Sequence, residues 1–181
     1  MLASNATDCS NAIDALRGLN VILQIDGDEN VVSANLSATK ITDDDLHHLS
    51  LLTELQRLQL ENTKITDAGL IHLAGLTNLV ALDLFRTHIT DAGLEHFQNL
   101  TNLEELYLGK TNVGDTGLKH LQGMTKLRDL AAYDTKITDA GLENLHGLKR
   151  LERLWIGKTK ATDAGVTKLR EAVPRVRVYN G

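Results

Sequence analysis

The chain has 181 residues, of which 42% are hydrophobic and 24% charged, and its formal net charge is −5. This length and composition are typical of one ordinary globular domain with a hydrophobic core. A mildly acidic chain without a basic block is a poor nucleic-acid binder, because affinity for a duplex rests largely on lysine and arginine neutralising phosphates. No apolar run reaches the length of a membrane-spanning helix, so we expect neither nucleic-acid binding nor membrane insertion.

Two features bear on the cellular compartment. A single cysteine, Cys9, excludes an internal disulfide and fits a reducing environment. The first residues do not combine a basic segment with an apolar stretch, so they do not form a signal peptide. We therefore expect a cytoplasmic protein if the chain is complete, and an exported one if a signal peptide has been removed.

The first 30 residues predict a cap. Residues 1–10 are polar, and we expect them to be frayed. Residues 11–18 carry apolar side chains at helical spacing, residues 21–25 are typical of a strand, and residues 31–36 form the next strand after a turn at 26–30. This helix and hairpin would cover the N-terminal end of a core built by the rest of the chain.

From residue 31 onward the sequence repeats with a period of 24. The motif Thr-x-Ile-Thr-Asp, or a close variant, begins at Thr39, Thr63, Thr87, Thr111, Thr135 and Thr159. In each repeat the leucines before this threonine, such as Leu58 and Leu60, alternate with polar residues as in a strand with one buried face. The apolar residues after it have helical spacing. The period predicts a solenoid of strand, turn and short helix, with parallel strands.

A family resemblance follows from these residues. The pattern Leu55-x-x-Leu58-x-Leu60-x-x-Thr63-x-Ile65 resembles the leucine-rich repeat, and the following Thr-Asp-Ala-Gly-Leu resembles the cysteine-containing subclass of F-box proteins and its bacterial relatives. The resemblance implies an α/β fold, a right-handed horseshoe arc with a parallel sheet on the concave side and short helices on the convex side. We expect a cap at 1–30, six repeats at 31–173 and a closing strand at 174–181.

Three columns of the repeat indicate structural roles. The threonine column lies where each strand ends, and its hydroxyls can satisfy backbone groups of the turn. An aspartate column follows at the start of each helix: Asp43, Asp67, Asp91, Asp115, Asp139 and Asp163. Either this aspartate or the threonine before it could cap the helix; Gly114 replaces that threonine while Asp115 stays, which favours aspartate. A recurrent glycine, as at Gly69 and Gly93, indicates close backbone approach between repeats.

Two columns contain potential metal ligands. Six aligned aspartates could suggest calcium, but one carboxylate per repeat, already used as a cap, makes a thin coordination shell. His48, His72, His96 and His120 share one repeat position and could bind a transition metal or respond to pH. A half-exposed helix position beside the core explains these histidines more simply. We expect no metal and no cofactor.

The outward-facing strand positions concentrate the aromatic residues. The chain has six aromatics, and four of them, Phe85, Tyr107, Tyr133 and Trp155, fall in these positions. Exposed aromatics on one surface indicate recognition, whereas the alternative is cross-strand packing that stabilises the sheet. With charged neighbours, the predicted partner-binding residues are Phe85, Tyr107, Tyr133, Trp155, Arg57, Asp83, Arg86, Glu105, Lys110, Asp129 and Arg153.

These features predict a non-catalytic, monomeric protein-interaction module that binds a protein partner on its concave face. The alternative is a structural or surface-display domain of a larger or secreted protein, with carbohydrate as a further ligand class. We expect no enzyme, because no Ser-His-Asp, Cys-His or paired-carboxylate set can be separated from the repeat columns.

Overall fold

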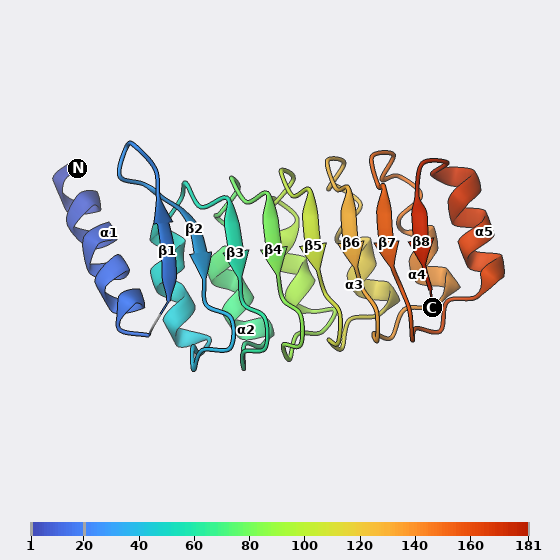
Figure 1. Ribbon diagram of the computed structural model, residues 1–181, viewed down its shortest axis with the longest axis horizontal. Helices are drawn as coiled ribbons and strands as arrows, with labels where there is room; N and C mark the ends of the chain where they lie inside the picture. Colours follow the sequence, from blue (N-terminus) through green and yellow to red (C-terminus); the bar gives the residue numbers. More distant parts are fainter. Residues whose placement is uncertain (1, 20, 181) are drawn as a thin grey trace.

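The computed structural model describes residues 2–19 and 21–180; Met1, Asn20 and Gly181 lie outside the described residues. Eight strands form one sheet in chain order, β1 to β8 (Figure 1). Strands β1 and β2 pair antiparallel, and every later neighbour pairs parallel. The strands are β1 (Ile22–Ile25), β2 (Val31–Asn35), β3 (Arg57–Gln59), β4 (Ala81–Asp83), β5 (Glu105–Tyr107), β6 (Asp129–Ala131), β7 (Arg153–Trp155) and β8 (Arg177–Tyr179).

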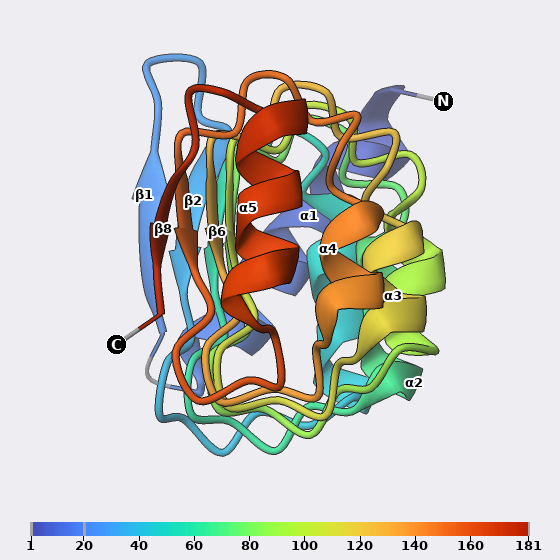
Figure 2. The ribbon, with the colours of Figure 1, turned by 90° about the vertical axis from the view of Figure 1, so that its right-hand side faces the viewer.

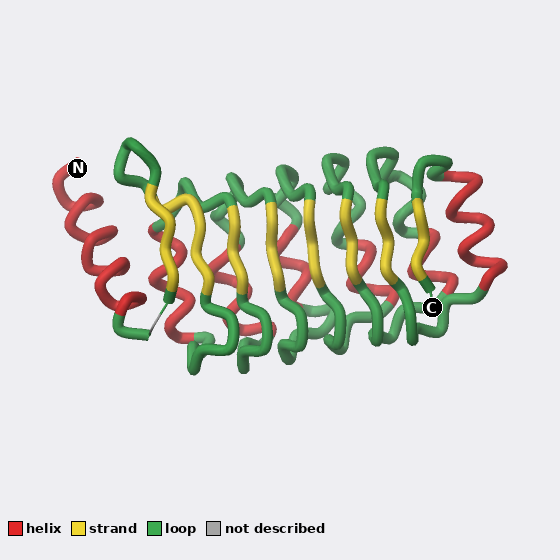
Figure 3. Tube along the Cα trace, viewed as in Figure 1, coloured by secondary structure: helices red, strands yellow, loops and turns green. Residues whose placement is uncertain are grey.

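The helices form a second layer behind the sheet, as the view along the stack shows (Figure 2). The α-helices are α1 (Leu2–Arg17), α2 (Asp67–Leu70), α3 (Asp115–Lys119), α4 (Asp139–Glu143) and α5 (Asp163–Ala172); the 3-10 helices are η1 (Asp44–Leu51), η2 (Ile71–Leu73) and η3 (Gly93–Phe97). The short helices follow one another behind the strands, with α1 and α5 at the two ends (Figure 3). The predicted leucine-rich-repeat solenoid, with parallel repeat strands and short helices, is confirmed.

The core lies between the two layers. Strand residues Leu58, Leu82 and Leu106 pair in register and are fully buried, together with the apolar residues of the helices behind them. Each repeat therefore buries its apolar side against the repeats before and after it. The predicted hairpin and final strand are present, but α1 begins at Leu2 rather than at residue 11. The division at residues 30 and 173 stays a prediction.

The threonine column satisfies the turns, as predicted. Each hydroxyl donates to the carbonyl oxygen three residues earlier, over 2.6–2.7 Å: Thr39 to Leu36, Thr63 to Leu60, Thr87 to Leu84, Thr111 to Leu108, Thr135 to Ala132 and Thr159 to Ile156. The column is thus a set of bonds within single repeats rather than a ladder between them. It secures the turn that follows each strand.

The prediction that the aspartates cap their own helices is wrong. Thr66 is the N-cap of α2 and accepts from the N–H of Ala68, and Thr138 caps α4 in the same way. The aspartates of the first five repeats instead reach the next repeat. Asp67 accepts two bonds from Thr90, one from its N–H at 2.7 Å and one from its hydroxyl at 2.6 Å. The aspartate column therefore ties consecutive repeats together.

The recurrent glycine makes room for that aspartate. A Cβ on Gly69 would lie 2.5 Å from Oδ1 of Asp43 and 2.8 Å from a methyl of Leu46. Close approach between repeats was predicted correctly, but a neighbouring side chain, not the backbone, makes it. Where the first repeat has no predecessor, Asp45 replaces the glycine and accepts from the N–H and hydroxyl of Thr42 itself, at 2.8 and 2.7 Å.

Candidate functional site

The outward-facing side chains of β2 to β8 form a surface opposite the helices, which we call the sheet face. Strand register aligns them in columns, as expected from the period. The first column is Ser33, Arg57, Ala81, Glu105, Asp129, Arg153 and Arg177. The second is Asn35, Gln59, Asp83, Tyr107, Ala131, Trp155 and Tyr179. Phe85 and Tyr133 lie in a third column, two residues further along their repeats.

The backbone beneath the third column is fixed by turns of unusual conformation. Arg86 and Lys110 each adopt the left-handed conformation, with φ of 54° and 55°. This conformation lets their N–H groups donate to the carbonyls of Gly109 and Tyr133 in the next repeat, both at 2.9 Å. A left-handed residue other than glycine costs roughly 1–2 kcal/mol. The inter-repeat hydrogen bonds help to hold it, so the third column stands on an ordered backbone.

Phe85 and Tyr133 come together although they are two repeats apart. Their ring centroids lie 5.5 Å apart with the planes tilted by 32°. Gly109, between them in the column, makes this possible: a Cβ there would lie 2.7 Å from Cε1 of Tyr133. The Tyr133 ring therefore lies over the glycine and reaches Phe85. Such tilted aromatic pairs contribute about 0.5–1.5 kcal/mol beyond their area burial.

A second aromatic pair closes the C-terminal end of the sheet face. Trp155 on β7 stacks on Tyr179 of β8, with centroids 5.2 Å apart and planes within 13°. Our sequence analysis did not include Tyr179 among the site residues. The signal was present, because Tyr179 follows Trp155 by one full period of 24 residues. Five of the six aromatics therefore lie on the sheet face, and we call these five the aromatic patch.

The aromatic patch is not one continuous apolar strip. Tyr107 lies in the second column, and its hydroxyl donates to Oε2 of Glu105 at 3.2 Å. Burial, with Glu105 beside it, raises the pKa of the Tyr107 phenol to about 12, so the phenol is protonated and remains a donor at neutral pH. The patch thus consists of two ring pairs and one polar aromatic.

Two ion pairs engage four of the predicted charges. Arg153 binds the two carboxylate oxygens of Asp129 with two guanidinium nitrogens, a bidentate pair, and Asp129 is only 4% exposed. Hydrogen bonding to this carboxylate raises the pKa of Arg153. Arg57 lies 3.8 Å from Glu105. These charges complement one another, and Asp129 is buried against its partner rather than presented to solvent.

The other predicted charges lie around the Phe85–Tyr133 pair. The Nζ atom of Lys110 lies 5.6 Å from the centroid of the Phe85 ring. Arg86, which occupies the equivalent position one repeat earlier, is exposed. Asp83 accepts from the N–H of Phe85 at 2.8 Å. Burial raises the pKa of the Asp83 carboxyl, against the opposing effect of that hydrogen bond. Asp83 is therefore a carboxylate held in an unfavourable environment.

Two hollows lie side by side on the sheet face. One, of about 420 Å³, is lined mainly by polar residues of β3 to β5, among them Arg57, Gln59 and Glu105. The other, of about 230 Å³, we call the aromatic pocket; it is lined by Glu61, Asp83, Phe85, Tyr107, Gly109, Ala131 and Tyr133. Glu61 was not among the predicted site residues, although it occupies the third column beside Phe85.

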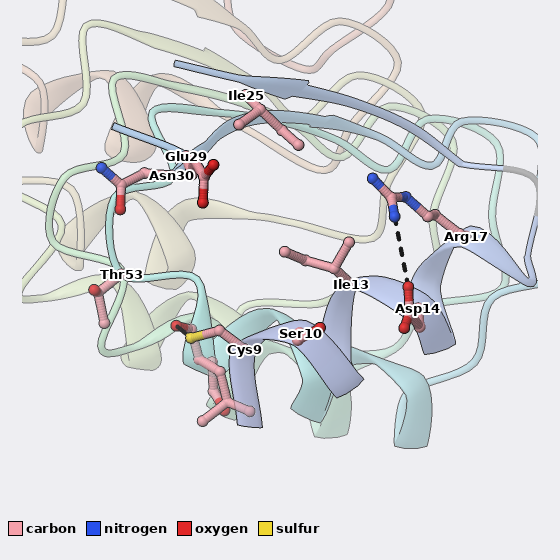
Figure 4. A pocket seen from close by; sticks show the side chains of 11 residues that line it. Cys9, Ser10, Ile13, Asp14, Arg17, Ile25, Glu29, Asn30 and Thr53 are labelled. Atoms are coloured by element: carbon pink, nitrogen blue, oxygen red, sulfur yellow. Dashed lines mark hydrogen bonds and ion pairs between the residues drawn. The ribbon is translucent and has the colours of Figure 1, made fainter. Parts of the chain in front are cut away.

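A larger hollow, about 810 Å³, lies off the sheet face. Figure 4 shows it between α1 and the hairpin, with Ile13 and Ile25 on opposite sides and Arg17 3.5 Å from Asp14. It contains none of the predicted site residues. Among the side chains that the structure describes, in residues 9–19 and 21–180, no three from histidine, cysteine or acidic residues gather as a metal site. The four aligned histidines are half-buried on the helical side.

No helix in the described part of the chain has the length and apolar character needed to cross a bilayer. Comparison with family models matches three consecutive stretches, residues 52–74, 75–97 and 99–121, to the leucine-rich repeat. Comparison with curated proteins gives no match.

Several solved structures resemble this one. Internalin C2 of Listeria monocytogenes has a TM-score of 0.62 at 24% identity, over 82% of this chain and 70% of that chain. Internalin inlF of the same organism has 0.61 at 23%, over 83% and 50%. The leucine-rich-repeat ectodomain of the Arabidopsis receptor kinase HAESA, in complex with an extended IDA peptide hormone, has 0.69 at 18%, over 98% and 33%.

This chain spans half of the inlF chain and a third of the HAESA chain. At these identities the likeness shows the fold, in agreement with the 24-residue register of the strands and the buried leucines. The chain thus carries leucine-rich repeats within residues 52–121, and its fold is that of a leucine-rich-repeat solenoid.

Proposed function

We propose that this protein is a non-catalytic interaction module that binds a polypeptide partner across its sheet face. The observation that carries the proposal is the aromatic patch, which places five of the six aromatics of the chain on one surface. A solvated sheet face needs no aromatic side chains, because polar residues serve there equally well. Tyr and Trp are the residues that most often dominate binding energy at interfaces.

The charges around the patch support a protein partner. An apolar centre with a charged rim is the usual arrangement of a protein interface. Here the ion pairs Arg153–Asp129 and Arg57–Glu105 border the rings, and Lys110 and Arg86 lie exposed beside them. The HAESA ectodomain, which shares the fold, is described in complex with a peptide hormone.

Site-specific photo-crosslinking in cells tests the proposal. A photoreactive phenylalanine analogue replaces Gln59, which is exposed on the sheet face but outside the aromatic patch. The matched control carries the analogue at Ile71, which is 55% exposed on the helical side. We expect one protein to be captured from Gln59 and not from Ile71. Capture of a protein from Ile71 but none from Gln59 would place the interface on the helical side.

Affinity measurements with the captured protein then test the aromatic patch. Truncating Tyr133 or Trp155 to alanine should weaken binding by about 2 kcal/mol, roughly 30-fold. Ile71→Ala should leave the dissociation constant unchanged. Thermal melts of each variant show whether the rings serve binding or the packing of the sheet. Unchanged affinity in both folded variants contradicts the proposal, and unfolding of both shows that the rings act in packing.

A further inference from the structure

The aromatic pocket has walls of two kinds. Phe85, Tyr107 and Tyr133 supply aromatic surface, and Glu61 and Asp83 supply carboxylates. Gly109 also lines the pocket, and its lack of a side chain makes room for the Tyr133 ring above it. The faces of aromatic rings carry negative potential, so they attract cations as carboxylates do. Both kinds of wall therefore favour the same ligand charge.

The field in the pocket is negative from several directions. Burial raises the pKa of the Tyr133 phenol first, and the charges of Glu61, Asp83 and Asp134 raise it further. These three acids come from the turns and strands of three different repeats. Arg86 and Lys110 are the cations nearby, and both are exposed at the rim. The interior of the pocket is thus acidic, whereas its rim is mixed.

The charge of Asp83 is not required by the fold. Its Oδ1 accepts from the N–H of Phe85 at 2.8 Å. Two repeats earlier in the same column, Asn35 makes the equivalent bond to the N–H of Ser37 at 2.9 Å. A neutral amide therefore makes the same turn without burying a charge. A carboxylate held at a raised pKa where asparagine suffices indicates a role in binding.

The protein's own Lys110 places a cation over Phe85, one of the rings that line the pocket. Its Nζ lies 5.6 Å from the centroid of the Phe85 ring, within the range of a cation–π interaction. Lys110 is exposed in a turn, so its long side chain can leave the ring. An ammonium group from outside would find, in the pocket that this ring lines, the carboxylates of Asp83 and Glu61 as well.

We infer that the aromatic pocket binds a lysine side chain of the polypeptide partner. The inference rests on the proposed function, and it names the kind of residue that the sheet face recognises. The Phe85 and Tyr133 rings contact the lysine stem and ammonium, and Asp83 and Glu61 neutralise its charge. Lys110 competes for the same ring, so an incoming lysine displaces it.

Short acetylated tripeptides with a central lysine, trimethyllysine or norleucine provide the probes. Norleucine matches the lysine stem but has no charge. Titrations are followed by the amide resonance of Gly109 and the ring resonances of Tyr133. We expect saturable shifts with lysine and trimethyllysine, and binding of norleucine weaker by about fivefold or more. Absence of shifts with the lysine peptide at about 50 mM, far above a millimolar dissociation constant, overturns the inference.

Substitutions in the pocket show how each residue contributes to the affinity for lysine. Tyr133→Leu, which keeps apolar bulk, and Asp83→Asn, which keeps the turn bond, should each weaken lysine binding by about fivefold. Lys110→Gln should tighten it by about threefold, because a competing cation is lost. Ile71→Ala, on the helical side and far from the pocket, is the control. Equal binding of norleucine, no effect of Asp83→Asn, or weaker binding in Lys110→Gln contradicts the inference.

Failure of this inference is distinguishable from failure of the proposed function. Gln59 lies outside the aromatic pocket, so crosslinking from Gln59 reports on the sheet face as a whole. Crosslinking that persists while the lysine peptide does not bind rejects only the pocket. Absence of a protein captured specifically from Gln59 rejects the sheet face as the interface.

Discussion

At the scale of the residue, the binding role that we propose for Asp83 opposes the stability of the fold. Its side chain supports the turn at Phe85, yet burial raises its pKa from the ordinary value of 3.8. A raised pKa in the folded state means that the ionised form is less favourable there than in the unfolded chain. Above the folded pKa the full cost is present, and it disappears as the pH falls below 3.8.

We therefore expect Asp83→Asn to be more stable than the wild type at neutral pH. The amide oxygen keeps the bond to Phe85, as Asn35 does for Ser37, and the buried charge is removed. The gain should shrink as the pH is lowered through the pKa of Asp83. Denaturant unfolding at several pH values measures it. A variant less stable than the wild type at neutral pH would show that the charge supports the fold.

At the scale of the element, the aspartate bridges explain why the repeats stack in one register. Asp43, Asp67, Asp115 and Asp139 each accept two bonds from a threonine in the next repeat. Asp91 accepts only one, from the N–H of Gly114 at 2.5 Å, because glycine has no hydroxyl. The junction between the third and fourth repeats therefore has one bond fewer than the others.

Gly114→Thr should restore the missing bond. The backbone of Gly114 is extended, and a Cβ would be 3.5 Å from the nearest atom, an ordinary contact. The new hydroxyl can donate to Asp91 and cap α3, while the unfolded chain loses glycine's freedom; we expect about 1 kcal/mol of added stability. Gly114→Ala is the control for the backbone effect. If both variants melt at the same temperature, the bridge contributes nothing measurable.

The misassigned helix cap shows what the motif did not reveal at this scale. Asp67 and Ala68 are adjacent in sequence, so local reasoning assigned the carboxylate to its own helix. In the solenoid, Asp67 is also next to Thr90, 23 residues later. Two sets of donors compete for the same carboxylate, those of its own helix and those of the next repeat, and the geometry of stacking decides between them. The threonine that precedes every aspartate of the column except Asp115 was available for the cap, and it is the cap at Thr66, Thr138 and Thr162.

The two ends of the molecule are built differently from its middle. At the first repeat Asp45 accepts the bonds from Thr42 that a preceding aspartate would otherwise accept. At the last, Asn180 donates to Asp163 at 3.4 Å. Figure 1 shows α1 at one end and α5 at the other. Solenoids need such distinct end units, since their internal repeats present apolar surface to a neighbour.

We expect the protein to be a monomer for this reason. Both ends of the core are covered, and Arg175 and Arg177 place charge at the last strand, which discourages edge pairing. Sedimentation velocity over a wide concentration range should give a single monomeric species. A dimer would contradict the prediction, and its loss in Ile22→Lys, a 66% exposed position on β1, would place the contact at the other edge of the sheet.

The sequence by itself determined the architecture and the columns. A period of 24 with alternating leucines permits one parallel register, and this register aligns Arg57, Glu105 and Arg153 on the sheet face as predicted. The same period also predicts that Tyr179, 24 residues after Trp155, lies on the sheet face. Periodicity is sufficient here because a one-residue slip would expose every buried leucine at once.

Only the tertiary structure decided which neighbours interact within those columns. Arg153 pairs with Asp129, the Tyr133 ring crosses Gly109 to Phe85, and Asp67 binds the following repeat. Each of these choices depends on side-chain rotamers and turn conformations whose free energies differ by about 1 kcal/mol. The register places several partners within reach at similar distance. A repeat pattern records which positions are adjacent, whereas packing and desolvation in three dimensions select the contacts.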